Sequence, residues 1–220
     1  MDYQAIALSL RLAAVTSLIL LAVGVPLAYW IAFSPRRWKF LVEAVVALPL
    51  VLPPTVLGFY ILLAISPRSP AGALYAKLTG GLLPFSFAGL VVASVLYSLP
   101  FMVQPVVTAF GAVDRKLIEA SWCLGISRAA TFRRVVAPLA RAGIATGVIL
   151  TFAHTLGEFG VVLMVGGNIA GVTRTVSISI YDQVQGLNYG AAGQTSLFLL
   201  VVSFAVLAAT YALERRFRLV

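Results

Sequence analysis

The sequence predicts an all-α membrane protein with five transmembrane helices, and two observations support this fold class. Hydrophobic residues make up 61% of the 220-residue chain and charged residues 10%, whereas soluble domains average about half and about a quarter. Five apolar stretches also exceed twenty residues, the length at which a helix crosses about 30 Å of hydrocarbon. They cover roughly residues 12–33, 44–65, 85–110, 142–165 and 191–213. We expect helices because lipid leaves unpaired backbone groups without partners.

The first stretch predicts a transmembrane helix with its N-terminus outside, not a cleavable signal peptide. It is too long for the apolar core of a signal, and the basic cluster at residues 36–39 follows it instead of preceding it. The second stretch contains Pro49, Pro53 and Pro54, which interrupt helical hydrogen bonds and predict a bend. Because broken helices are tolerated where they line a cavity, this stretch either lines one or is simply kinked.

The third and fourth stretches carry packing signals of their own. Pro100 predicts a bend in the third. Gly143 and Gly147 form a G-x-x-x-G pair in the fourth, which predicts close contact with a helix of this chain or of a second copy. The connections 66–84 and 166–190 are predicted to lie outside. The middle of the second connection, TVSISIYDQV, fits a short helix as well as a strand-like re-entrant piece.

The positions of the basic residues set the predicted orientation. The chain has 16 Lys and Arg against 7 Asp and Glu, and a cytoplasmic segment 35–39 places most of the basic residues on one side, as the positive-inside rule requires. These residues are Arg36, Arg37, Lys39, Arg115, Lys116, Arg128, Arg133, Arg134, Arg141, Arg215, Arg216 and Arg218. The C-terminus is then cytoplasmic, and residues 1–220 form one transmembrane domain. Three separate short basic segments do not make a nucleic-acid surface.

Several kinds of active site are excluded by residue counts. Cys123 is the sole cysteine and His154 the sole histidine, so an intrachain disulfide and a metal site built on these residue types are excluded. The sequence has no G-x-x-x-x-G-K-[ST] phosphate loop and no pairing of a nucleophile with a base. We therefore expect no catalytic residue, no metal and no cofactor on this chain.

The polar segment 112–138 predicts a small helical elbow in the cytoplasm. Asp114 caps a helix over about 115–124, and Gly125 suits the left-handed position after it. Ser127 caps a second helix over about 128–136, and Pro138 is expected to end it. A basic amphipathic segment also fits a helix lying flat on anionic lipid. The glycine turn and the small apolar residues favour packing into a protein groove instead.

The elbow resembles the EAA loop of ABC-importer permeases. The matching positions are Glu119, Ala120, Gly125 and Pro138, while Ser121, Val135 and Ala137 replace the alanine, isoleucine and leucine of the pattern. The resemblance implies a type I ABC importer architecture, in which this loop docks in a groove of a separate ATPase subunit. ATP and Mg²⁺ then bind to that partner. It further implies that Glu119 pairs with a basic residue of the ATPase and that Leu124, Ile126 and Ala129 fill the groove.

The resemblance extends along most of the chain, through the stretches LPLVLPPTVLGFYIL, SLPFMVQPVVTAF and HTLGEFGVVLMVGGNIAGVTRTVSISIYDQVQ. These look like molybdate permeases, and sulfate permeases share LGEFG and the following GN. The resemblance implies an ATP-driven molybdate importer of the prokaryotic inner membrane, with tungstate as a near-isosteric substrate and a sulfate-type permease as the alternative. It also implies a permease homodimer, two ATPase chains and an extracytoplasmic oxyanion-binding protein.

Neutral hydroxyl donors in the spans are the candidates for contact with an oxyanion in transit. They are Thr55, Ser94, Ser98, Thr151 and Thr155. Alternatively, such hydroxyls bond to their own backbone or to a neighbouring helix. For Glu158, the one acid well inside a span, we favour a structural role, protonated or tied to backbone near Gly157 and Gly160, over a gate. Glu158→Gln should then leave uptake largely intact.

Other functions find less support in the residues. His154 is expected to be packed or hydrogen-bonded instead of relaying protons. An ion-coupled secondary transporter would need a coupling-ion site, and the spans offer only Glu158 and His154 for one. A membrane-bound enzyme lacks paired acids or metal ligands, and a passive scaffold would need neither the elbow nor the broken spans.

Overall fold

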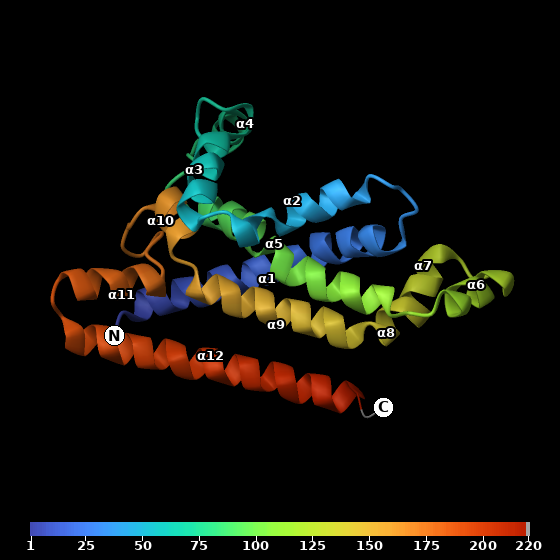
Figure 1. The fold of residues 1–220 in the computed structure, drawn as a ribbon. Helices are drawn as coiled ribbons and strands as arrows, with labels where there is room; N and C mark the ends of the chain where they lie inside the picture. The colour runs from blue at the N-terminus through green and yellow to red at the C-terminus, as the bar shows by residue number, and fades with distance from the viewer. Residues whose placement is uncertain (219–220) are drawn as a thin grey trace.

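Three long helices form the frame of the molecule and run roughly along one direction (Figure 1). The computed structural model describes the backbone of residues 1–218 and the side chains of residues 1–212. The long helices are α1 (Tyr3–Phe33), α5 (Phe87–Gly111) and α12 (Tyr189–Arg218). Their most apolar windows have mean hydropathies of 2.3, 1.9 and 2.0, so each is long and apolar enough to cross a membrane. They correspond to the first, third and fifth predicted spans.

The second predicted span is two helices joined by a sharp bend. α2 (Lys39–Val51) and α3 (Pro54–Ile65) are bent by 117° relative to each other. Leu52 has extended backbone, with φ −72° and ψ 137°, as a residue before proline prefers. Neither Pro53 nor Pro54 has an N–H to continue the helical hydrogen bonds. As a result α2 lies beside α1, whereas α3 points away from the long helices (Figure 1).

The fourth predicted span is also interrupted. α9 (Arg141–Gly157) ends at Glu158, whose backbone is extended at φ −60° and ψ 134°, and α10 (Gly160–Gly166) starts two residues later. α10 packs against α3, and a Cβ added to Gly160 would lie 2.9 Å from Cβ of Pro54. The breaks in the two interrupted spans therefore lie side by side.

Gly143 and Gly147 place α9 directly against α5. A Cβ added to Gly143 would overlap Cβ of Ala109, and one added to Gly147 would lie 3.0 Å from the carbonyl oxygen of Met102. The helix that this G-x-x-x-G pair contacts thus belongs to the same chain, which decides between the two alternatives. The main apolar core lies along these contacts, between α1, α5 and α9.

The elbow projects from one end of the helices (Figure 1). It contains α6 (Arg115–Cys123), α7 (Arg128–Thr131), a π-helix (Phe132–Val136) and α8 (Ala137–Leu139). The connection between α1 and α2 and the C-terminal end of α12 lie at this same end, as five crossings require. The predicted cytoplasmic side chains of Arg215, Arg216 and Arg218 lie outside the described residues.

The prediction that Pro138 ends the second short helix is wrong. The backbone stays helical through Leu139 and changes direction at Ala140, where ψ is 6° and the chain bends by 75° into α9. The π-helix accommodates the proline. The N–H of Ala137 donates to the carbonyl oxygen of Phe132, five residues back, and Pro138 has no N–H that needs a partner.

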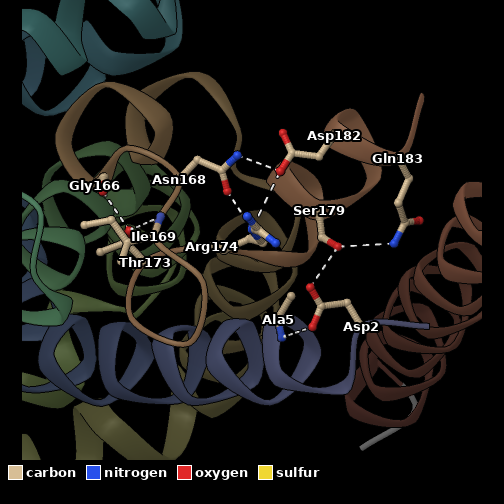
Figure 2. A network of polar contacts seen from close by, with 10 residues as sticks. All are labelled: Asp2, Ala5, Gly166, Asn168, Ile169, Thr173, Arg174, Ser179, Asp182 and Gln183. Carbon is tan, nitrogen blue, oxygen red and sulfur yellow. Dashed lines mark hydrogen bonds and ion pairs between the residues drawn. The ribbon is translucent and has the colours of Figure 1, made fainter. Parts of the chain in front are cut away.

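At the end opposite the elbow, the segment whose conformation was open in the sequence is a helix. α11 (Val176–Gln185) packs beside the start of α1 and against α12. Ser179 on α11 donates to Asp2 at 3.1 Å, while the other oxygen of Asp2 caps α1 by accepting from the N–H of Ala5. Figure 2 draws both contacts. The N-terminus is therefore fixed to α11.

A second group of contacts holds the loop before α11. Arg174 Nε donates to Asn168 Oδ1 at 2.6 Å and lies 3.6 Å from Asp182 Oδ2, to which Asn168 Nδ2 also donates at 2.6 Å (Figure 2). The short helix α4 (Pro70–Thr79) lies beyond α3, away from the long helices (Figure 1). These polar contacts therefore order the loop at the end of the molecule farthest from the elbow.

Candidate functional site

A cluster of polar side chains lies inside the bundle, where α9 ends. Ser94 and Ser98 are four residues apart on α5, which places them on one helix face. Their hydroxyls form hydrogen bonds with the two carboxyl oxygens of Glu158, at 2.5 and 2.7 Å. Glu158 is 3% exposed and both serines are fully buried. The serines thus provide the partners that a buried carboxyl group needs, since burial without partners would cost several kcal/mol.

Ser98 is the centre of this cluster. Its Oγ lies 3.0 Å from Oγ1 of Thr155 and 2.9 Å from Nδ1 of His154, in addition to its bond with Glu158. The imidazole of His154 stacks on Phe101, with ring centroids 3.9 Å apart, and its Nδ1 lies 3.5 Å from Oε1 of Glu158. Side chains of α5 and α9 are therefore joined by one continuous hydrogen-bonded group.

A cavity of about 560 Å³ opens beside the cluster. It is lined by Pro54, Thr55, Tyr97, Ala153, His154, Gly157, Glu158, Phe159 and Gly160. These residues come from the break before α3, from the break between α9 and α10, and from the face of α5 between them. The cavity, the two helix breaks and the polar cluster therefore occupy one place in the fold.

The elbow is ordered by its own polar contacts. Ser121 Oγ bonds to the carbonyl oxygen of Ile118 at 2.7 Å and lies 2.8 Å from Oγ1 of Thr131, which ties α6 to α7. Gly125 makes the turn between them with φ +74°, and a Cβ added there would meet nothing within 4 Å. The turn thus depends on backbone conformation alone, and not on space.

Aromatic packing attaches the elbow to the bundle. The ring of Phe132 lies edge-on to Tyr29 of α1 at 5.4 Å and to Phe110 of α5 at 6.1 Å. The tip points outward, and Leu124 beside Gly125 is 79% exposed. The elbow thus has one face fixed to two long helices and another available to a partner.

Comparison with known proteins identifies the family to which this chain belongs. Residues 24–219 match the family described as binding-protein-dependent transport system inner membrane component. The chain belongs to this family. It is 52% identical over 217 residues to the molybdenum transport system permease protein ModB of Azotobacter vinelandii, covering 99% of this chain and 96% of the relative. It is 33% identical to ModB of Escherichia coli K12, over 94% of this chain and 90% of the relative.

Solved transporters have the same fold as this inner membrane component. A bacterial importer of the polysaccharide alginate superposes with a TM-score of 0.77 at 18% identity, covering 97% of this chain and 79% of that one. The MetNI methionine transporter superposes with a TM-score of 0.74 at 17% identity, over 99% and 96%. The predicted all-α importer-permease architecture is therefore confirmed. As a permease subunit of an ABC transporter, the chain works with ATP hydrolysis on a separate chain.

The structure brings together most of the candidate hydroxyls of this permease. Ser94, Ser98 and Thr155 share the cluster with Glu158, and Thr55 lines the adjoining cavity. Thr151 does not line the cavity, and its buried Oγ1 has no hydrogen-bond partner in the described part of the chain. For Glu158 the sequence left two forms of a structural role open, a protonated carboxyl group or a tie to the backbone. In the described residues two serine side chains, and not the backbone, hold the carboxyl group.

Two polar side chains that line the cavity, those of His154 and Tyr97, were not among the candidates for contact with an oxyanion. His154 is packed and hydrogen-bonded, as expected, but it also lines the cavity. Its spacing of four residues from Glu158, which puts both on one helix face, is the signal that identifies it. Tyr97 carries no such signal, because its position depends on how α3 and α5 meet, whereas Pro54 belongs to the break that the sequence predicts in the second span.

Most of the predicted coupling residues lie on the exposed side of the elbow. The exposed ones are Glu119, Ala120, Leu124, Gly125, Ala129 and Pro138, and Ile126 is half-buried. Ser121 points inward, to Thr131. In this permease, the serine that replaces the alanine of the EAA pattern therefore holds the two helices of the elbow together.

Proposed function

We propose that this permease is the membrane subunit of an ATP-driven molybdate importer. The observation that carries the proposal is 52% identity, across 99% of the chain, to a permease named for molybdenum transport. Tungstate is a tetrahedral dianion of nearly the same size, so it is proposed as a second substrate. A sulfate-type permease is the alternative, and no observation on this chain favours it over molybdate.

The working assembly contains two copies of this chain, two ATPase subunits and an extracytoplasmic binding protein. ATP and Mg²⁺ are bound by the ATPase. The exposed tip of the elbow supports this division, since Leu124 and Ala129 offer small and apolar surface and Glu119 offers a charge for a basic partner residue. The elbow inserts into the ATPase, and movement there reaches α1 and α5 through the Phe132 contacts with Tyr29 and Phe110.

The oxyanion crosses through the region where the helix breaks meet. Among the residues that the structure describes, no Lys or Arg lines the 560 Å³ cavity, so the dianion is met by neutral donors that hold it weakly and release it readily. Thr55 lines the cavity and is the candidate hydroxyl for direct contact, whereas Ser94, Ser98 and Thr155 lie beside it and bond within the cluster. The delivery protein supplies selectivity, and the permease needs only to replace part of the hydration shell during passage.

Reconstitution into proteoliposomes tests this function. The permease is combined with its ATPase and with the binding protein, and ATP hydrolysis and accumulated metal are measured with molybdate, tungstate or sulfate. We expect molybdate and tungstate to stimulate hydrolysis and to accumulate, and sulfate to do neither. Stimulation by sulfate alone would replace the proposal with the sulfate alternative. Transport without any ATPase would contradict the importer assignment altogether.

A further inference from the structure

We propose that His154 presents an Nε2–H donor to the cavity and that this donor contacts the oxyanion during passage. The inference rests on the proposed function, because it names a contact for the same substrate. His154 is 19% exposed by side chain and lines the cavity, whereas Glu158 behind it is 1% exposed. Nδ1 faces Ser98, and Nε2 has no hydrogen-bond partner among the described residues. The protonation of Nε2 follows from counting hydrogens in the cluster.

The count begins with the two hydroxyls that have a single partner. Ser94 is fully buried and contacts only Oε2 of Glu158, so its hydrogen points there and Oε2 accepts. Thr155 is 2% exposed and its hydroxyl contacts only Ser98, so its hydrogen points to Ser98. Any other arrangement leaves a buried hydroxyl hydrogen unpaired, which costs about 1–3 kcal/mol.

Ser98 then has one hydrogen to give and one lone pair left to accept with. Its two remaining neighbours are Oε1 of Glu158 at 2.7 Å and Nδ1 of His154 at 2.9 Å. A hydroxyl has one hydrogen and two acceptor positions, and Thr155 occupies one of these positions. Ser98 must therefore donate to one neighbour and accept from the other. Only one of Oε1 and Nδ1 carries a hydrogen.

Each of the two cases leads to a hydrogen on Nε2. If Oε1 carries the hydrogen, Nδ1 is bare, and a neutral imidazole then has its hydrogen on Nε2. If Nδ1 carries it, Glu158 is ionised, and His154 is either an imidazolium with a hydrogen on Nε2 or a neutral ring without one. The last arrangement is strongly disfavoured, because it leaves an unbalanced negative charge buried in the membrane. In the described part of the chain, no Lys or Arg lines the cavity to balance that charge.

This arrangement also answers why an acid beside the path does not repel the cargo. The carboxyl group of Glu158 bonds to Ser94 and Ser98 and its side chain is 1% exposed, whereas the more exposed imidazole of His154 offers a hydrogen-bond donor to the cavity. Stacking on Phe101 and a ring contact with Tyr97 at 4.7 Å fix the plane of that donor. Tyr97, Glu158 and His154 are the titratable groups that line the cavity.

Nitrogen NMR on the complete transporter tests the proposal directly, because His154 is the sole histidine of the permease. The permease is labelled with ¹⁵N-histidine, assembled with unlabelled ATPase and unlabelled binding protein in nanodiscs, and recorded with and without molybdate. We expect a protonated Nε2 whose resonance moves on addition of molybdate. An unprotonated Nε2, or a resonance that molybdate leaves in place, would overturn the inference.

Two variants give an independent functional readout. His154→Phe keeps a stacking ring but removes the donor, and we expect its maximal molybdate uptake to fall at least tenfold. His154→Gln keeps an N–H donor near the position of Nε2 and should recover most of the loss. Uptake by the His154→Phe transporter within twofold of the unsubstituted protein would refute the contact. Because the proposed function is judged on the unsubstituted transporter, failure there is distinguishable from failure of this inference.

Discussion

Among single residues, Gly125 decides whether the elbow can form. Its φ of +74° is a left-handed conformation, which costs roughly 1–2 kcal/mol for an ordinary residue and more for a β-branched one. Gly125→Val should therefore distort the tip while the membrane helices still assemble. We expect molybdate-stimulated ATP hydrolysis to fall about tenfold, the effect of roughly 1.4 kcal/mol, with unchanged amounts of permease in the membrane.

Gly125→Asn is the matched control for this effect. Asparagine tolerates the left-handed region better than other non-glycine residues, and a Cβ at this position meets nothing within 4 Å. The asparagine variant should retain most of the coupled hydrolysis. If valine and asparagine reduce hydrolysis equally, side-chain size at the ATPase contact, and not the backbone of the turn, is what matters.

Single residues also show what the sequence does and does not reveal about the site. The sequence identifies the polar residues of the cluster, because a polar group in an apolar span is costly unless it finds a partner. These residues are Ser94, Ser98, Thr155 and Glu158. Their convergence is not recognisable, because it depends on how α5 and α9 are rotated against each other. That Glu158→Gln leaves uptake largely intact stays a prediction. The cluster gives it a physical basis, because a neutral amide can also form hydrogen bonds with Ser94 and Ser98.

At the scale of helices, the contact between α5 and α9 depends on a missing side chain. A Cβ on Gly143 would overlap Ala109 and approach the carbonyl oxygen of Pro105 to 2.9 Å. Gly143→Ala should therefore lower the stability of the folded permease by about 1–3 kcal/mol, as overpacking does. The measurement is the midpoint of unfolding in detergent, by intrinsic fluorescence or far-UV circular dichroism.

Gly193→Ala on α12 is the control for the same chemical change. A Cβ at Gly193 meets nothing within 4 Å, so the substitution adds only the better helix propensity of alanine. This variant should be as stable as the unsubstituted permease or slightly more so. Equal destabilisation by both alanines would mean that the α5–α9 contact is looser than the structure shows.

Breaks in helices are predictable to different degrees. Pro53 and Pro54 announce the bend before α3, because their rings remove donors from the backbone. The break at Glu158 contains no proline. Gly157 and Gly160 indicate that a break is possible there, but they do not predict the residue at which α9 ends. The π-helix before Pro138 is invisible in the sequence, since nothing distinguishes a proline that ends a helix from one that a wider turn accommodates.

For the whole molecule, the elbow, which is the proposed contact with the ATPase, lies apart from the cavity proposed for the passage of the cargo. The elbow lies at one end, fixed to α1 and α5 through Phe132. The same helix α5 carries Ser94 and Ser98, which hold Glu158 at the break between α9 and α10. A displacement of α5 thus acts on the cavity lining directly, without passing through the loops at the far end.

The two ends of the molecule are predicted to face opposite sides of the membrane, and labelling of one native residue tests this. Cys123 is the sole cysteine and is exposed in the elbow. A membrane-impermeant maleimide should label it in inside-out vesicles and not in intact spheroplasts, because the basic segments at this end face the cytoplasm. Labelling is measured as a mass shift on gels, with the permease expressed without its ATPase so that nothing covers the elbow.

The matched variant moves the thiol to the other end of the molecule. Cys123→Ser combined with Gln185→Cys places it at the exposed C-terminal residue of α11, opposite the elbow, and should reverse the pattern of labelling. Adding purified ATPase to inside-out vesicles should slow modification of Cys123, because the predicted coupling residues surround it. The Gln185→Cys variant should stay unlabelled in these vesicles, with or without ATPase, because its thiol faces the vesicle interior. Labelling of Cys123 from outside would invert the topology and leave the elbow on the wrong side for any ATPase.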